Sequence, residues 1–322
     1  MSLLTTRRAV LGATVTAPAI AVAQGFPNRP VRLVCPFAAG GSADASARQL
    51  AEALAPVLGQ PVVVENRPGG GATIGAQAVA RAQPDGHTLL YGTPGPQIIN
   101  PHLMRSVPYD PEKDFAPVAG YKRAPNLLAV TPGLPARSVA EVIALAKARP
   151  GMLSFASSGI GSSSHLAGEM LKFLAQIDIT HVPYRGTGPA LTDLMGGTVS
   201  MALDTLSILL PPSRSGHLRA LGVTTPGRSA LAPELPALAE TLPGFDAAPF
   251  NYIATTGGTP APIVARLNQA IVGILNEPAY RARMEALGEE ATPSSPEELA
   301  ATIRAESARW KQVIEAAGIR AE

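Results

Sequence analysis

Short β-branched runs alternate along the chain with longer stretches in which apolar residues recur every three or four positions. The first pair is a run at 31–36 and a helical pattern over 44–58, which ends before Gly59. Strands that alternate with helices in this way are typical of βαβ units and a mainly parallel sheet. The same pattern predicts strands at 61–65, 88–91, 153–156, 180–182 and 200–203, and helices at 72–82, 139–148, 164–175 and 190–195.

Two extended stretches interrupt this alternation. After a polar, proline-rich passage at 94–117, residues 116–121 and 126–131 have the pattern of consecutive strands. A second extended stretch at 218–224 precedes a C-terminal part with helical patterns at 262–276, 278–287 and 296–317. Two βα series with two crossings between them predict a hinged clamshell of the α/β class. Its ligand would lie between the lobes, off the carboxyl ends of the strands.

The crossings also predict how the chain is divided. We expect one lobe to comprise residues 24–124 and 231–322 and the other to comprise 125–230. The 322 residues leave room for about two domains of ordinary size, which agrees with two lobes.

The N-terminus has the pattern of an export signal. Arg7 and Arg8 precede a soft apolar stretch that ends in Ala21-Val22-Ala23. A charged start, a short apolar core and an A-x-A site are typical of a signal peptide over residues 1–23. The paired arginines favour the twin-arginine route, and the general secretory route is the alternative. No later segment reaches the about 20 apolar residues that span a bilayer, so we expect a soluble periplasmic protein.

Composition excludes several classes of partner. Charged residues make up 16% of the chain, the formal net charge is +2, and no run of lysine and arginine follows the N-terminus. We therefore expect no nucleic-acid partner. The single cysteine, Cys35, rules out a disulfide within the chain.

Two glycine- and serine-containing loops carry the candidate binding chemistry. The first, 36–44, runs from a strand into a helix, and its glycine pair lets the backbone approach a ligand closely. The helix behind it presents free N–H groups and a positive dipole end, which together favour anions. The second loop, 157–165, has the same context in the other lobe. Two such loops favour one anionic ligand between them; two unrelated βα turns are the alternative.

Catalytic and cofactor motifs are missing from the sequence. There is no G-x-S-x-G or H-E-x-x-H motif, and the five histidines are scattered. The glycine run at 69–75 misses the dinucleotide fingerprint by one position. We expect no enzyme activity, no metal and no cofactor. The alternative is an exported serine hydrolase that uses Ser163 with His165, which opens the helix at the second loop.

Several short motifs, taken in order, resemble the Bug-type periplasmic receptors, the solute-binding subunits of tripartite tricarboxylate transporters. They run over nearly the whole mature chain and include Gly40-Gly41-Ser42 with Asp44, Val64 to Gly69, Pro84 to Thr88, Asp114 to Val118, Ser157 to Gly161 and His181 to Gly186. This resemblance implies a type II periplasmic-binding-protein fold with two α/β lobes joined by two crossing strands. It also implies a ligand carboxylate held in the cleft by the two loops.

The resemblance implies a set of ligand-binding residues. From the first loop it carries over Phe37, Ala39, Gly40, Ser42 and Asp44. From the second it carries over Ser157, Ser158, Gly159, Ser162, Ser163 and His165. On the same side and on the pocket floor it adds Tyr184, Arg185, Gly186, Asp204 and Thr205, with Gln97 farther out to help choose the rest of the ligand.

The implied partners are a small carboxylate ligand and the large and small membrane subunits of a permease, with the receptor itself a monomer. A sensor that docks on a membrane kinase is the alternative. Three segments depart from the family pattern. They lie at 94–97, at 255–260 and at 250–252, and near the last of these the family often has a tryptophan. These departures leave the distal contacts of the ligand undefined.

Overall fold

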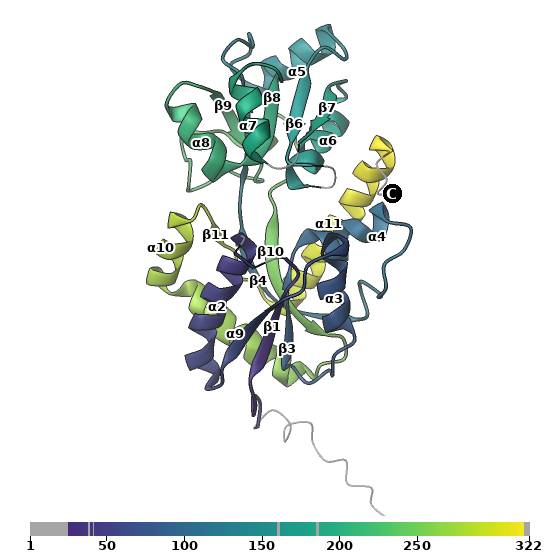
Figure 1. Cartoon of the computed structure of the whole chain (residues 1–322), viewed down its shortest axis with the longest axis vertical. Coiled ribbons are helices and arrows are strands. Elements are labelled where there is room, and N and C mark those ends of the chain that lie inside the picture. The colour runs from purple at the N-terminus through teal and green to yellow at the C-terminus, as the bar shows by residue number, and fades with distance from the viewer. Residues whose placement is uncertain (1–24, 38, 41, 160–161, 185–186, 319–322) are drawn as a thin grey trace, which may run out of the picture.

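Two mixed β-sheets lie at the centres of two lobes (Figure 1). The computed structural model describes residues 25–37, 39–40, 42–159, 162–184 and 187–318. The first sheet has the strand order β11-β4-β10-β3-β1-β2 and the second has the order β7-β6-β8-β5-β9. We call the lobe around the first sheet the first lobe and the other the second lobe. The predicted α/β class is confirmed, and the domain boundaries at 124/125 and 230/231 stay a prediction.

Each sheet combines a parallel trio with antiparallel neighbours. In the first sheet, β1 (Val31–Cys35) pairs in parallel with β2 (Val62–Asn66) and β3 (Thr88–Gly92). The antiparallel strands of that sheet are β10 (Phe250–Thr256), β4 (Phe115–Arg123) and β11 (Glu290–Ala291). The sheets are therefore more mixed than the sequence pattern predicts.

The second sheet repeats this plan. Strand β6 (Ser154–Ser157) pairs in parallel with β7 (Thr180–Pro183) and β8 (Met201–Thr205). Strand β5 (Asn126–Val130) lies antiparallel to β8 and to the edge strand β9 (Arg219–Val223). In both sheets, the glycine-serine loops predicted to bind the ligand follow a strand of the parallel trio.

Helices cover both sheets, as the apolar periodicity predicts. The first lobe carries α2 (Ser42–Leu58), α3 (Thr73–Ala80), α9 (Ala261–Asn276) and α10 (Pro278–Ala286). The second lobe carries α5 (Val139–Ala148), α6 (Ser163–Ala175), α7 (Thr187–Met195) and α8 (Leu206–Arg214). Helix α8 was not predicted from the sequence, because it contains the proline pair Pro211-Pro212. Among the described residues, no helix combines the length and apolar character needed to cross a bilayer.

The proline-rich passage at 94–117 is more structured than expected. It contains one π-helical turn, η2 (Gly95–Ile99), followed by α4 (Asn100–Leu103). A proline near the start of each turn occupies a position where the missing N–H costs no hydrogen bond. The passage therefore forms short helical turns that the sequence pattern did not predict. Short 3₁₀ turns also occur at η1 (Gly70–Ala72) and η3 (Leu238–Glu240).

Two segments cross between the lobes side by side. The first links β4 to β5, and the second returns from β9 to β10 (Figure 1). The amide of Ala124 donates to the carbonyl of Pro249 over 3.0 Å, which ties the two crossings together. The stretch 218–224, expected to form the return crossing, instead pairs with β5 at the edge of the second sheet. The return ends in β10, whose nearly continuous burial shows no alternation that the sequence could reveal.

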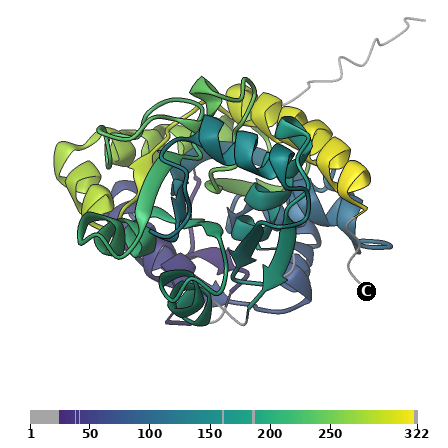
Figure 2. The same cartoon turned by 90° about the horizontal axis from the view of Figure 1, so that it is seen from above.

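The last helix, α11 (Pro296–Ala317), contacts both lobes. It begins with a capping box in which Ser295 and Glu298 bond each other's backbone amides. Its buried residues recur at helical spacing: Leu299, Ile303, Trp310, Val313 and Ile314. The helix packs against β4 and against α6 of the second lobe, and Figure 2 shows it running along one side of the molecule. It therefore forms a side wall that spans the gap between the lobes.

Candidate functional site

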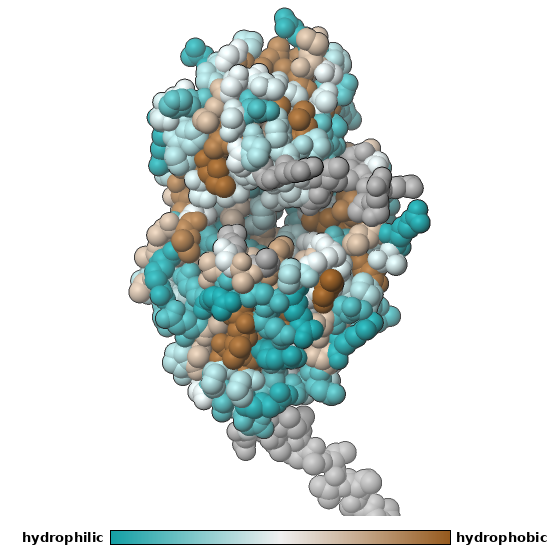
Figure 3. Space-filling model, viewed as in Figure 1, coloured by the Kyte–Doolittle hydropathy of each residue, from teal (hydrophilic) through white to brown (hydrophobic). Residues whose placement is uncertain are grey.

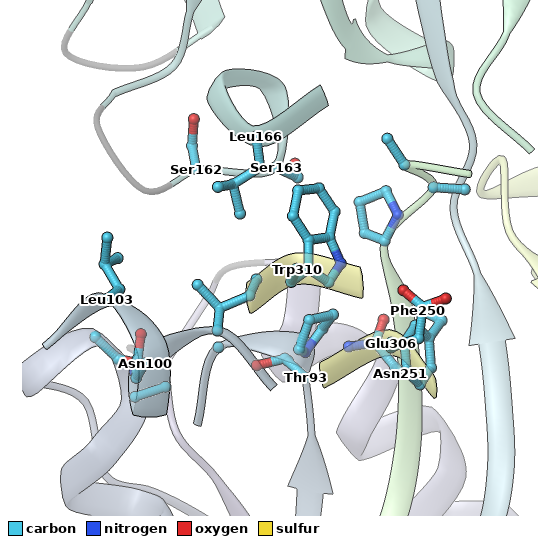
Figure 4. Close-up of a pocket in the computed structure, with 18 of the residues that line it drawn as sticks. Thr93, Asn100, Leu103, Ser162, Ser163, Leu166, Phe250, Asn251, Glu306 and Trp310 are labelled. Atoms are coloured by element: carbon cyan, nitrogen blue, oxygen red, sulfur yellow. The ribbon is translucent and has the colours of Figure 1, made fainter. Parts of the chain in front are cut away.

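A cavity of about 510 Å³ lies between the two lobes. The space-filling view shows the surface hollowed there, and the close-up shows its walls (Figures 3 and 4). Its lining comes from Phe37 after β1, from η1, η2 and α4, from the start of α6, from the crossing at 246–251 and from α11. Both glycine-serine loops therefore border one cavity, the first through Phe37 and the second through Ser162 and Ser163.

The first loop is held in shape by Asp44. The amide of Gly40 donates to a carboxylate oxygen of Asp44 over 2.9 Å, and Gly40 has a positive φ of 84°. The side chain of Asn66 donates to the other oxygen of Asp44 over 2.9 Å and to the carbonyl of Phe37 over 3.1 Å. Arg48 adds a charged hydrogen bond of 3.0 Å to Asp44. The loop is thus folded around a buried carboxylate.

These contacts make Asp44 a strong acid. The hydrogen bond from Arg48 contributes most, followed by those from Gly40 and Asn66, and together they lower the pKa of Asp44 to about 2. Its charge therefore stays fixed and paired at neutral pH. Of the other residues predicted in this loop, Phe37 is exposed at the cavity wall and Ala39 is exposed. The side chain of Ser42 lies outside the described part of the structure.

The second loop is a network of hydroxyl groups around the start of α6. Ser162 caps the helix, since its oxygen accepts from the amide of His165 over 3.2 Å. The hydroxyl of Ser164 bonds the amide and hydroxyl of Ser158, each over 2.9 Å. Gly159 has φ 138° and accepts from Ser162 over 2.6 Å. Ser163, at the first position of α6, is exposed and lines the cavity.

Two histidines lie beneath this loop. The rings of His165 and His181 stack with centroids 4.1 Å apart, and His181 also stacks on Phe155. Ser157 and His181 are joined by a hydrogen bond of 2.7 Å. Burial, with smaller contributions from neighbouring positive groups, lowers the pKa of each histidine to about 4. Both rings are neutral at pH 7, so neither supplies a positive charge to the cleft.

The remaining predicted residues have protein partners. The hydroxyl of Tyr184 donates to Asp193 over 2.6 Å. Asp204 is buried and accepts from Thr187 over 3.1 Å and from the amide of Thr205 over 2.7 Å. Arg185 and Gly186 lie outside the described residues.

Gln97 lies in the core behind the cavity wall. It is buried, its amide donates to the carbonyl of Pro111 over 3.0 Å, and its oxygen accepts from Tyr252 over 2.8 Å. Both ends of its side chain are thus bonded to protein groups. Its neighbours Pro94 and Gly95 reach the cavity.

Several residues that line the cavity were not predicted from the sequence. They are Asn100 and Leu103 of α4, Leu166 of α6, and Glu306 and Trp310 of α11. Figure 4 shows the ring of Trp310 between Ser163 above and Thr93 below. The segment at 250–252, flagged as a departure from the family pattern, does contribute Phe250 and Asn251. No sequence motif marks Glu306 and Trp310 as cavity residues, because only the tertiary fold brings α11 to the cleft.

Two acid–arginine pairs stand at the hinge side of the cavity. Both oxygens of Asp246 accept from one nitrogen of Arg123, over 2.8 and 2.9 Å. Glu306 accepts from Arg309 on the next turn of α11. Burial raises the pKa of Glu306, and the nearby Arg309 opposes this shift. Among the described residues, no group of three or more histidine, cysteine or acidic side chains is placed to hold a metal.

Comparison with known proteins places this geometry in a family. Residues 46–319 match the model of the tripartite tricarboxylate transporter family receptor. The solved structure of R. palustris Rpa4515 with adipate is 38% identical, covers 92% of this chain and 99% of that one, and superposes with a TM-score of 0.75.

Two further solved structures are similar over their whole length. The periplasmic binding protein BugD is 35% identical, with a TM-score of 0.71 and coverage of 92% of this chain and 100% of that one. MatC from Rhodopseudomonas palustris with bound malate is 36% identical, with a TM-score of 0.71 and coverage of 90% and 100%. These structures confirm the predicted type II periplasmic-binding-protein fold. The chain belongs to the receptor family of the tripartite tricarboxylate transporters.

Proposed function

We propose that this protein captures a small carboxylate in the cleft between its lobes and delivers it to a tripartite transporter. The observation that carries the proposal is that two loops, one from each lobe, border the same cavity. Each loop leads from a parallel strand into the N-terminus of a helix, where backbone N–H groups and the helix dipole favour an anion. Adipate and malate in the two R. palustris relatives are both carboxylates, which supports the same ligand class here.

The donors in the described part of the cleft are mostly neutral. Backbone amides and the hydroxyl of Ser163 can donate to a carboxylate, and the described lining adds no fixed positive charge. Closure of the lobes around the bound carboxylate would then bring the two loops together.

Membership of a receptor family also supports the partners and the location. We infer that the membrane subunits of a permease receive the ligand, that the protein acts in the periplasm after export, and that it is not an enzyme. The imidazole of His165 stacks on His181 and lies 3.9 Å from Glu169, an arrangement of the helix interior and not of an activated nucleophile pair.

A charge placed at the start of α6 tests the proposal. Ser163→Asp puts a carboxylate where the ligand carboxylate would bind, yet an acidic residue in the first turn favours the helix. Like charges about 4 Å apart near a protein surface repel by a few kcal/mol, so we expect carboxylate affinity to fall on the order of a hundredfold. Calorimetry and thermal shift with a panel of carboxylates on residues 24–322 measure it.

The matched control is Ser138→Asp. Ser138 caps α5, a helix of the same lobe on the side away from the cleft (Figure 1). We expect this variant to bind as the parent chain does. Equal affinity in both variants, or no thermal shift from any carboxylate in the panel, would count against the proposed function.

A further inference from the structure

The ionisable groups on the cavity wall have one sign. Among the described residues that line it, Asp246 and Glu306 are the two ionisable side chains, and both are acids. Their arginine partners, Arg123 and Arg309, are not part of that lining. Both acids therefore reach the cavity, while the arginines that pair with them stand outside its lining.

Most of the remaining lining is apolar, and its polar side chains, those of Thr93, Asn100, Ser162, Ser163 and Asn251, carry no charge. Trp310 and Phe250 present aromatic rings, and Leu103 and Leu166 project into the same space (Figure 4). All four are buried in the protein apart from the edge that meets the cavity. A cavity of about 510 Å³ is within the range that holds a small organic ligand. Apolar groups of a ligand would gain about 25 cal/mol for each Å² removed from water.

The two acids and the apolar side chains of this wall affect the two ends of a ligand differently. One carboxylate finds backbone and hydroxyl donors at the paired loops. A second carboxylate, on the far end of the ligand, would lose its water beside aromatic rings and beside two acids. Burying a charge without a partner costs several kcal/mol, and the described lining offers no cationic side chain as that partner.

We propose that the cleft selects a monocarboxylate with an apolar body over a dicarboxylate of the same shape. This inference rests on the proposed function, because it assumes that one carboxylate binds at the loops. Trp310, Phe250, Leu103 and Leu166 contact the apolar body. The second charge is disfavoured because the described lining offers no cationic side chain to pair with it and places Glu306 and Asp246 beside it. Burial of Glu306 agrees with this role, since a carboxylate with a raised pKa is one held in poorly hydrated surroundings.

Isosteric pairs of acids test the selection directly. An isopropyl group has nearly the shape of a carboxylate but no charge. We compare para-isopropylbenzoate with terephthalate, and adipate with the analogue in which isopropyl replaces one carboxylate. Calorimetry on the mature chain should show at least about tenfold tighter binding for the monocarboxylate of a pair, which corresponds to ~1.4 kcal/mol.

The sequence supplies an optical probe for the same experiment. Trp310 is the single tryptophan of the chain and lies in the cavity wall. Binding of the monocarboxylate should therefore shift or quench the intrinsic emission. Calorimetric binding that leaves the emission unchanged would place the apolar body elsewhere and overturn the inference.

Glu306→Gln identifies the source of the discrimination. The amide keeps the size of the side chain and removes its charge, so the affinity for the dicarboxylate should rise several-fold while that for the monocarboxylate stays the same. Glu315→Gln is the matched control, because Glu315 is exposed on the same helix. It should leave both affinities unchanged.

The outcomes separate the two proposals. A dicarboxylate that binds as tightly as its isostere, or more tightly, would overturn the selection and leave the carboxylate receptor intact. If neither member of either pair binds and the wider panel also fails, the proposed function falls and the selection falls with it.

Discussion

Asp44 places a negative charge beside a site proposed for a negative ligand. Its oxygens accept from Gly40, Arg48 and Asn66, so its charge is neutralised within the loop. We infer that it positions the loop backbone and that the amides around it do the binding. Serine hydroxyls play the corresponding part in the second loop, where Ser164 ties Ser158 to the start of α6.

The low pKa of Asp44 predicts a pH dependence of stability. An aspartate with pKa about 2 when folded and about 3.9 when unfolded stabilises the fold at pH values above the unfolded pKa. That contribution is lost as the pH falls through 2. Asp44→Asn should therefore lower the free energy of unfolding by a constant amount above about pH 5, and the difference should shrink towards pH 2. Denaturant unfolding of both chains across this range measures it; a difference that grows on acidification would contradict the assignment.

The helix that carries the second loop is fixed by close packing on its strand. Helix α6 rests on β6, and Gly168 faces the ring of Phe155, which stacks in turn on His181. A methyl group at position 168 would lie 2.1 Å from the Phe155 ring. The position of the serine network above this stack therefore depends on a residue without a side chain.

Gly168→Ala tests this dependence. The added carbon must displace Phe155 or tilt α6, and overpacking of this kind costs typically about 1–3 kcal/mol. We expect a lower melting temperature and weaker carboxylate binding. Gly273→Ala is the matched control: it lies in α9 with nothing within 4 Å of the added carbon, and should stabilise by ~1 kcal/mol through helix propensity. Equal effects of the two substitutions would refute the packing argument.

At the scale of the whole molecule, α11 and the two crossing segments, which lie far apart in the sequence, connect the two lobes. The helix packs on β4 of the first lobe and on α6 of the second, so it spans the cleft at one side. The ion pair of Arg123 with Asp246 joins the two crossings where the cavity meets the hinge. Opening or closing of the lobes would therefore change the contacts of α11. Trp310 of that helix lies in the cavity wall.

The sequence predicted the loops more fully than it predicted the cavity. Strands and helices of both βα series follow from local periodicity, and the glycine-serine loops stand out between them. The helices around Pro96 and Pro211 were missed because proline near a helix start or end reads as a break. The wall formed by Leu166, Glu306 and Trp310 could not be predicted, because α11 follows α6 by more than a hundred residues and meets it through the tertiary fold alone.

The central claim is that one carboxylate is held between the two loops. A crystal structure of the mature chain with bound para-isopropylbenzoate tests it most directly. We expect the carboxylate oxygens within about 2.7–3.2 Å of donors from both 36–44 and 157–165, with the ring against Trp310. A carboxylate bound to one lobe alone, or seated at the arginines Arg32, Arg67 and Arg81 that line a separate pocket of the first lobe, would contradict it.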